Sequence, residues 1–169
     1  MLIVFSGLPG TGKTTLARAL AASLGAVYLR IDSIEQALRN SQVTGTDIGS
    51  SGYVVANAIA LDNLNSGRRV VVDCVNPVQE SRAAWSTTAA SAGSRLLNVQ
   101  IVCSDRTQHR QRVESRVVDV PGLVPPTWQS VDQHDYEPWQ PSPFTVDTAQ
   151  LSPQAALALI VEQLAGCSE

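Results

Sequence analysis

Residues 7–14 read Gly-Leu-Pro-Gly-Thr-Gly-Lys-Thr, after the apolar run 2–5 and before a segment with leucines at positions 16, 20 and 24. This order fits a strand, a turn and a helix around the pattern Gly, any four residues, Gly-Lys-Ser/Thr. The glycines let the backbone N–H groups point at phosphate oxygens, and the following helix adds its positive N-terminal end. The stretch predicts a loop that binds a nucleoside triphosphate.

The side chains of this loop have separate expected roles. Lys13 is expected to reach the β- and γ-phosphates as a catalytic group, and the Thr14 hydroxyl is expected to ligate Mg²⁺. Lys13 is the only lysine beside eleven arginines. This exception is informative because a planar guanidinium cannot replace a compact ammonium in the cradle. The residues expected to bind the nucleotide are Gly10, Thr11, Gly12, Lys13, Thr14 and Thr15.

Length and composition favour a single domain over residues 1–169, with 44% hydrophobic and 16% charged residues. We find no signal peptide and no apolar run long enough for a membrane span, so no membrane partner is expected. Cys74, Cys103 and Cys167 have no metal-site spacing, which favours a reducing, cytoplasmic location. The chain is expected to be a monomer or a homodimer.

Charge is unevenly distributed along the chain. Residues 1–103 contain eight basic and six acidic side chains, whereas residues 117–169 contain seven acidic and no basic ones. A surface for a long nucleic acid needs clustered cations, which the carboxy-terminal third does not supply. A small-molecule substrate is therefore favoured, and a short nucleic-acid end stays open.

Apolar runs alternate with helical patterns along the chain, which predicts an α/β fold with a parallel sheet covered by helices on both faces. Strands are expected over 2–5, 27–31, 69–73, 97–103 and 144–147. Helices are expected over 13–24, 33–39, 53–65, 76–92, 105–116, 127–134 and from 152 onward, the last burying Leu157, Ile160, Val161 and Leu164. The polar, glycine-rich residues 41–52 predict a loop. Ligands of such sheets bind at the carboxyl ends of the strands.

Two carboxylates follow predicted strands at that edge. Asp32 can accept the proton of a substrate hydroxyl that attacks the γ-phosphate, and it also fits a helix-capping box with Glu35. Asp73 ends an apolar strand, as a metal-binding carboxylate does, although aspartate also ends strands as a turn former. Cys74 stands where ATP-hydrolysing motors usually have glutamate, and a single lysine excludes the guanine-recognition motif Asn-Lys-x-Asp.

The segment 105–116 contains four arginines, of which Arg112 and Arg116 lie four residues apart on one helix face. It is either a solvated helix face or a lid, approximately 105–126, whose arginines neutralise charge on the transferred phosphoryl group. We assign Arg116 first and Arg112 second as catalytic residues, and we expect His109 to be exposed.

The remaining candidates lie after the third predicted strand or among the aromatic residues. Asn76 is a substrate candidate or a helix N-cap, and Arg82 contacts substrate or braces a loop. Tyr53 is assigned to the substrate side as well. Three further aromatic residues form either a wall over the site or core filling: Trp128, Tyr136 and Trp139.

These residues resemble the small P-loop kinases, an AAA-type ATP-binding group that includes phage polynucleotide kinase, chloramphenicol phosphotransferase, gluconate kinase and zeta-type toxins. The matching positions are 7–14, Asp32, 71–77, Arg82, Trp85, Arg112, Arg116 and 136–139. The resemblance implies a three-layer sandwich with a five-stranded parallel sheet in order 2-3-1-4-5, and binding of ATP with Mg²⁺. It also implies Asp32 as the substrate-positioning base and Arg116 as the lid arginine.

One departure bears on the substrate. Polynucleotide kinases of this group tend to carry arginine where this chain has Glu35. We therefore expect transfer of the ATP γ-phosphoryl group to a hydroxyl of a nucleoside, sugar or antibiotic-like molecule, with GTP left open as donor. The alternatives are a 5′-hydroxyl polynucleotide kinase and a nucleotide-binding regulator without phosphotransfer.

Overall fold

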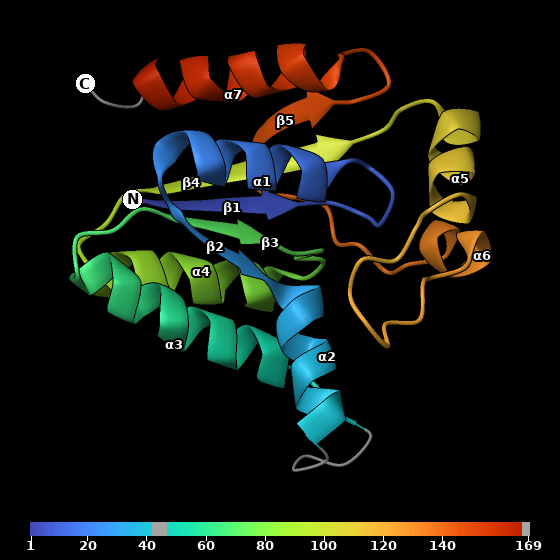
Figure 1. The fold of residues 1–169 in the computed structure, drawn as a ribbon. Helices are drawn as coiled ribbons and strands as arrows, with labels where there is room; N and C mark the ends of the chain where they lie inside the picture. The colour runs from blue at the N-terminus through green and yellow to red at the C-terminus, as the bar shows by residue number, and fades with distance from the viewer. Residues whose placement is uncertain (42–46, 167–169) are drawn as a thin grey trace.

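The computed structural model describes residues 1–41 and 47–166, and its centre is a five-stranded parallel sheet (Figure 1). The strands are β1 (Leu2–Ser6), β2 (Val27–Arg30), β3 (Val70–Asp73), β4 (Leu96–Val102) and β5 (Phe144–Asp147). Their order is β2-β3-β1-β4-β5, and every pairing is parallel. The predicted sheet order is confirmed. Part of the predicted loop 41–52, and Cys167, lie outside the described residues.

The helices are α1 (Lys13–Leu24), α2 (Ile31–Ser41), α3 (Ser51–Asn65), α4 (Gln79–Ser91), α5 (Arg106–Glu114), α6 (Trp128–Asp132) and α7 (Pro153–Gly166). Helices on both faces of the sheet give three layers, while α5 and α6 lie beyond the carboxyl ends of the strands (Figure 1). Side chains alternate along a strand, so β1 sends Ile3 and Phe5 to one face and Leu2 and Val4 to the other. The first pair packs with α1 and α7, and the second with α3 and α4 (Figure 1).

Three sequence-based expectations about helices need correction. Helix α2 begins at Ile31, so Asp32 lies in its first turn instead of preceding it. Helix α4 begins at Gln79 with Val78 as N-cap, and Asn76 precedes it with a positive φ of 53°. In α7, Val161 is 44% exposed because Ala156 and Ile160 form the buried face.

The register of the sheet gathers the predicted site at one edge. Phe5 pairs with Asp73, and Arg30 pairs with the same aspartate from the other side. The loop after β1, the end of β3 and the start of α2 therefore meet at the carboxyl ends of adjacent strands. This edge is where ligands bind in open α/β sheets.

Candidate active site

The loop between β1 and α1 is shaped by glycines at positive φ, with Gly7 at 139°, Gly10 at 84° and Gly12 at 96°. A Cβ at Gly7 would lie 2.2 Å from the carbonyl oxygen of Ile101, and one at Gly10 would lie 2.5 Å from Val113. Two of these glycines are thus required both by backbone conformation and by close packing. The loop is held between β4 and α5, which carries Arg112 but ends at Glu114, so Arg116 does not lie on the predicted helix face.

Lys13 is buried at the first turn of α1, and its Nζ donates a hydrogen bond to the carbonyl of Leu8, 2.9 Å away. Burial lowers the pKa of Lys13, while the nearby carboxylates of Asp73 and Asp32 oppose the shift only in part. The protein thus holds a poorly solvated ammonium inside the curl of the loop. A phosphate oxygen placed there would add to the opposite charge that the two carboxylates supply only in part.

Two oxygen-bearing side chains that could bind a metal ion, Thr14 and Asp73, lie beside Lys13. The Thr14 hydroxyl donates to Asp73 Oδ2 at 2.7 Å, and the Tyr28 hydroxyl donates to the same oxygen at 2.8 Å. Within the described residues, no cluster of three or more His, Cys, Asp or Glu could hold a metal ion. One hydroxyl and one carboxylate nevertheless fit Mg²⁺, which commonly takes one or two carboxylates and completes its shell with water and substrate phosphates.

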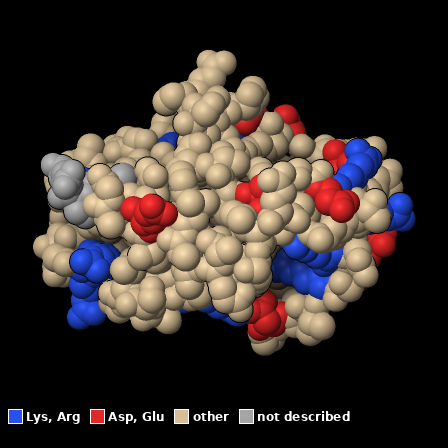
Figure 2. Space-filling view, turned by 90° about the horizontal axis from the view of Figure 1, so that it is seen from above, with Lys and Arg blue, Asp and Glu red and all other residues tan. Residues whose placement is uncertain are grey.

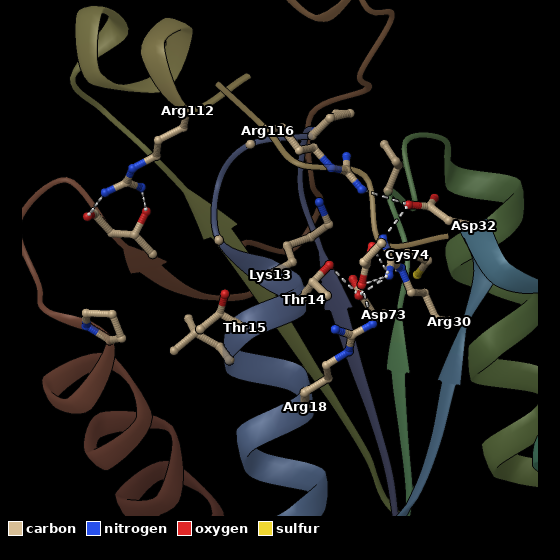
Figure 3. A pocket seen from close by; sticks show the side chains of 18 of the residues that line it. Lys13, Thr14, Thr15, Arg18, Arg30, Asp32, Asp73, Cys74, Arg112 and Arg116 are labelled. Carbon is tan, nitrogen blue, oxygen red and sulfur yellow. Dashed lines mark hydrogen bonds and ion pairs between the residues drawn. The ribbon is translucent and has the colours of Figure 1, made fainter. Parts of the chain in front are cut away.

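On the side of β2, Arg30 and Asp32 form a second charged group. Arg30 is buried, and its guanidinium donates to Asp32 at 3.3 Å and to both carboxylate oxygens of Asp119 at 2.9 Å. From the segment after α5, Arg116 reaches Asp32 at 3.4 Å (Figure 3). Asp32 therefore lies between an arginine of the sheet and an arginine of the predicted lid.

These groups line one cavity of about 560 Å³. The predicted site residues that the cavity brings together are Gly10, Gly12, Lys13, Thr14, Thr15, Asp32, Asp73, Arg112 and Arg116. Thr11 is buried instead, and its hydroxyl donates to the carbonyl of Leu8 at 2.9 Å. The phosphate loop and the Asp32 carboxylate thus share one space, which the sequence alone could only suggest.

Arg112 lies away from Asp32, at the other end of this cavity (Figure 3). Its guanidinium donates to the hydroxyl and carbonyl oxygens of Thr148, at 2.7 and 2.9 Å, and to Gln108 at 2.6 Å. The Thr148 hydroxyl in turn donates to the carbonyl of Thr11 at 2.7 Å. Arg112 therefore ties the lid helix to the loop after β5.

The three candidates assigned only to the substrate side do not line the cavity. Asn76 is fully buried and donates to the Ser6 hydroxyl at 3.0 Å, so it is not the predicted helix cap. Tyr53 accepts a hydrogen bond from the backbone N–H of Asn76 at 2.9 Å. Arg82 donates to four backbone carbonyls, and these contacts support the loop-bracing alternative.

The three aromatic candidates pack against other side chains of the protein, and the histidine that was expected to be exposed is buried. Arg82 lies over the rings of Tyr136 and Trp139, while the third ring, Trp128, packs edge-on against His109. His109 is buried, with Nε2 2.8 Å from the carbonyl oxygen of Pro9, so its expected exposure is wrong. This contact joins α5 to the phosphate loop.

Other cavity residues were missed by the sequence reasoning. Arg30 precedes Asp32 at the carboxyl end of β2, so the edge rule that found Asp32 could have found it too. Arg18 lies one turn along α1 from Thr14, which is a weaker signal. Thr148 directly follows β5, so the same edge rule could have found it, whereas Asp119 carries no sequence signal and reaches the cavity only through the fold.

Sheet order, glycine loop and the Thr14–Asp73 pair together define a P-loop nucleotide-binding fold. The family model described as an AAA domain matches residues 2–125, so the chain belongs to that family. The predicted P-loop kinase resemblance is thereby confirmed at the level of family and fold. In the part of the chain that the structure describes, no helix has the length and apolarity to cross a bilayer.

Curated relatives are longer than this chain. The uncharacterized protein Rv2004c of Mycobacterium tuberculosis is 32% identical over 115 residues, which are 61% of this chain and 23% of that protein. An uncharacterized protein of Mycobacterium bovis matches to the same extent. The chain therefore spans less than two thirds of the length of these relatives.

Several solved structures share the fold. A Chloroflexus aurantiacus protein provisionally described as a kinase matches with a TM-score of 0.75 at 22% identity, covering 98% of this chain and 96% of that one. The M. tuberculosis APS kinase CysC, in complex with AMPPNP and APS, matches with a TM-score of 0.73 at 19% identity. The match covers 97% of this chain and 96% of that one. A Sinorhizobium meliloti gluconokinase matches with a TM-score of 0.62 at 22% identity, covering 99% of this chain and 97% of that one. At these identities the likeness is one of fold.

Proposed function

We propose that this chain is a kinase domain that transfers the γ-phosphoryl group of ATP to a hydroxyl of a small molecule. The observation that carries the proposal is that Lys13, Thr14 and Asp32 line the same cavity. A triphosphate held by the loop would direct its terminal phosphate toward the side where Asp32 lies. A carboxylate within hydrogen-bond reach of an attacking hydroxyl is the arrangement that general-base catalysis requires.

Each residue has a defined part in the reaction. The acceptor oxygen forms a bond to the γ-phosphorus while the bond to the β–γ bridging oxygen breaks, and that electron pair leaves with ADP. Asp32 accepts the hydroxyl proton, while Lys13 and Arg116 neutralise charge on the transferred group. Thr14 and Asp73 would hold Mg²⁺, which neutralises phosphate charge when bound. Arg112 would close the nucleotide end of the cavity.

Charge distribution supports a small acceptor over a long nucleic acid. On the face seen in Figure 2, blue Lys and Arg side chains lie apart from one another or beside red Asp and Glu. Phosphate neutralisation along a nucleic acid needs a continuous cationic surface instead. The fold is also that of a gluconokinase and of an APS kinase, which supports a small-molecule acceptor.

Further features support the nucleotide and the organisation of the domain. The similar CysC structure contains AMPPNP, which supports a nucleotide at this loop, with ATP proposed as donor and GTP left open. Both hydrophobic cores are built on the one sheet, which supports a single domain over 1–169. No residue of the proposed lid near 105–126, a segment that the structure describes throughout, belongs to either core. The free thiols of Cys74 and Cys103 support a cytoplasmic location.

The proposal is tested by binding and transfer together. Calorimetry measures uptake of ATP with Mg²⁺, and mass spectrometry detects gain of one phosphate across a panel of hydroxyl metabolites and antibiotics. We expect Lys13→Ala and Asp32→Asn to abolish transfer, and Asp132→Asn, outside the cavity, to leave it unchanged. Nucleotide binding without transfer to any acceptor would favour the regulatory alternative, and wild-type turnover in Asp32→Asn would remove the base.

A further inference from the structure

A carboxylate from the segment after α5 occupies the acceptor side of the cavity. Asp119 receives two hydrogen bonds of 2.9 Å from Arg30 Nη1 and one of 2.6 Å from Arg18 Nη2. It follows Arg116 in a stretch without regular structure, whereas the two arginines belong to α1 and to the end of β2. The lid segment thus places its own anion between a cation of helix α1 and a cation of strand β2.

The two sides of this contact differ in how firmly they are held. The Arg30 side chain is only 3% exposed, and its Nε is buried without a hydrogen-bond partner among the described residues. Asp119 is 39% exposed, and its near neighbour Val117 is 87% exposed. Arg30 cannot turn to solvent to satisfy its charge, but Asp119 can be replaced by another anion at little cost, since partly exposed ion pairs contribute little.

The charge balance of the cavity agrees with such an exchange. Among the described residues, its lining includes five cationic side chains and three anionic ones, the latter being Asp32, Asp73 and Asp119. Withdrawal of Asp119 would leave Arg18 and Arg30 facing open space beside Asp32. Two guanidinium groups that converge on one carboxylate have the geometry to bind a carboxylate or a phosphate monoester.

We propose that Arg18 and Arg30 form the subsite for an anionic group of the acceptor, and that Asp119 fills this subsite until the acceptor binds. The inference rests on the proposed kinase function and narrows its substrate class to a hydroxyl compound that carries a carboxylate or a phosphate. Arg30 contacts both Asp32 and Asp119, so the reacting hydroxyl and the anionic group lie within the span of one small molecule.

The test measures anion binding while AMPPNP and Mg²⁺ saturate the phosphate loop, so that the loop itself cannot take up the probe. Sulfate stands for a phosphate group and malonate for a carboxylate, and both are titrated by calorimetry. In Asp119→Asn we expect at least one probe to bind about fivefold more tightly than in the wild type. A fivefold change in affinity corresponds to the energy of one partly exposed ion pair, which the probe no longer has to break. The probe that gains more identifies the anionic group.

Two variants provide the controls. Adding Arg18→Gln to Asp119→Asn is expected to remove the gain, and this exposed arginine can be changed without disturbing the core. Asp132→Asn breaks a comparable aspartate–arginine pair, with Arg106 at 2.6 Å, outside the cavity and is expected to leave anion binding at the wild-type level. Equal affinity of wild type and Asp119→Asn for both probes overturns the inference.

A failure of this inference can be told apart from a failure of the kinase proposal. Absence of AMPPNP binding would defeat the kinase proposal, whereas AMPPNP binding with unchanged anion affinity would defeat only the subsite. The acceptor found by the metabolite panel gives a second readout. We expect Asp119→Asn to lower KM for an anionic acceptor without lowering kcat, and a neutral acceptor whose KM is unchanged would contradict the subsite.

Discussion

Two arginines are buried to nearly the same extent, yet they have opposite surroundings. Arg82 is 3% exposed and Arg30 is 4% exposed. Arg82 donates to backbone carbonyls of residues 76, 77, 137 and 138 and packs against two aromatic rings. Arg30 is surrounded by carboxylates, and the side chains of two of them, Asp32 and Asp119, are 35% and 39% exposed.

The difference separates a structural cation, Arg82, from Arg30, the cation that we propose binds the acceptor. Backbone carbonyls are fixed by the chain and cannot leave, so a guanidinium that they satisfy holds a loop together. Partly exposed carboxylates can move away, so a guanidinium that they satisfy remains available to a ligand. The partners of a buried arginine thus say more about its role than its burial does.

Among changes of arginine, the largest effect is expected on the cavity side, from Arg116→Gln. This change removes a lid cation from the transferred phosphoryl group, so turnover should fall by on the order of 10³-fold, or about 4 kcal/mol in the barrier. The free energy of unfolding should change by less than about 1 kcal/mol, because the pair with Asp32 is partly exposed. Steady-state kinetics and urea unfolding measure the two quantities.

The matched control is Arg110→Gln. Arg110 lies on α5, its side chain is 60% exposed, and its ion pair among the described residues is with Glu114 of the same helix. Its loss should leave turnover at the wild-type level. A fall in turnover equal to that of Arg116→Gln would mean that general lid charge matters, and not the arginine beside Asp32.

Arg82→Gln is expected to lower the stability of the protein and to leave its nucleotide affinity unchanged, whereas Arg116→Gln is expected to lower turnover and to leave stability nearly unchanged. The shorter amide leaves most of the four carbonyls without a donor and removes the cation from Trp139, 4.2 Å from its ring centroid. Unfolding in urea should show a loss of about 3 kcal/mol, since buried acceptors lose their hydrogen bonds. Nucleotide affinity of the folded protein should be retained, and a loss of stability below about 1 kcal/mol would contradict the bracing role.

The smallest effect concerns the pH dependence of Asp119. Hydrogen bonds from Arg30, and then from Arg18, lower the pKa of this carboxyl from 3.8 to about 2. A lowered pKa in the folded state adds stability above the unfolded value, and that stability is lost as pH falls through the folded value. The difference in melting temperature between wild type and Asp119→Asn should be constant from about pH 7 to 5 and shrink below about pH 4. A difference that grows on acidification would contradict the ion pair.

The sequence predicted the features that depend on neighbouring residues or on strand ends. Glycines, lysine and threonine of the loop are specified by their spacing, and Asp32 and Asp73 follow apolar strands at the ligand edge. Arg82 could not be interpreted in this way, because its partners at 137 and 138 lie more than fifty residues later. The cap alternative for Asn76 is wrong, because its buried side chain bonds to Ser6 at the end of β1, seventy positions earlier in the sequence.

By itself, the sequence determined the parallel sheet, the phosphate loop and the two carboxylates, because hydrophobic periodicity and glycine spacing are local properties of the chain. Only the tertiary structure added Arg18 and Arg30 to the two cavity arginines that the sequence had predicted. Asp119 reaches Arg30 across 89 positions of sequence, and no local pattern encodes that contact. Long-range pairs of charged side chains are set by how the layers pack, so the substrate side of this site emerges from the fold.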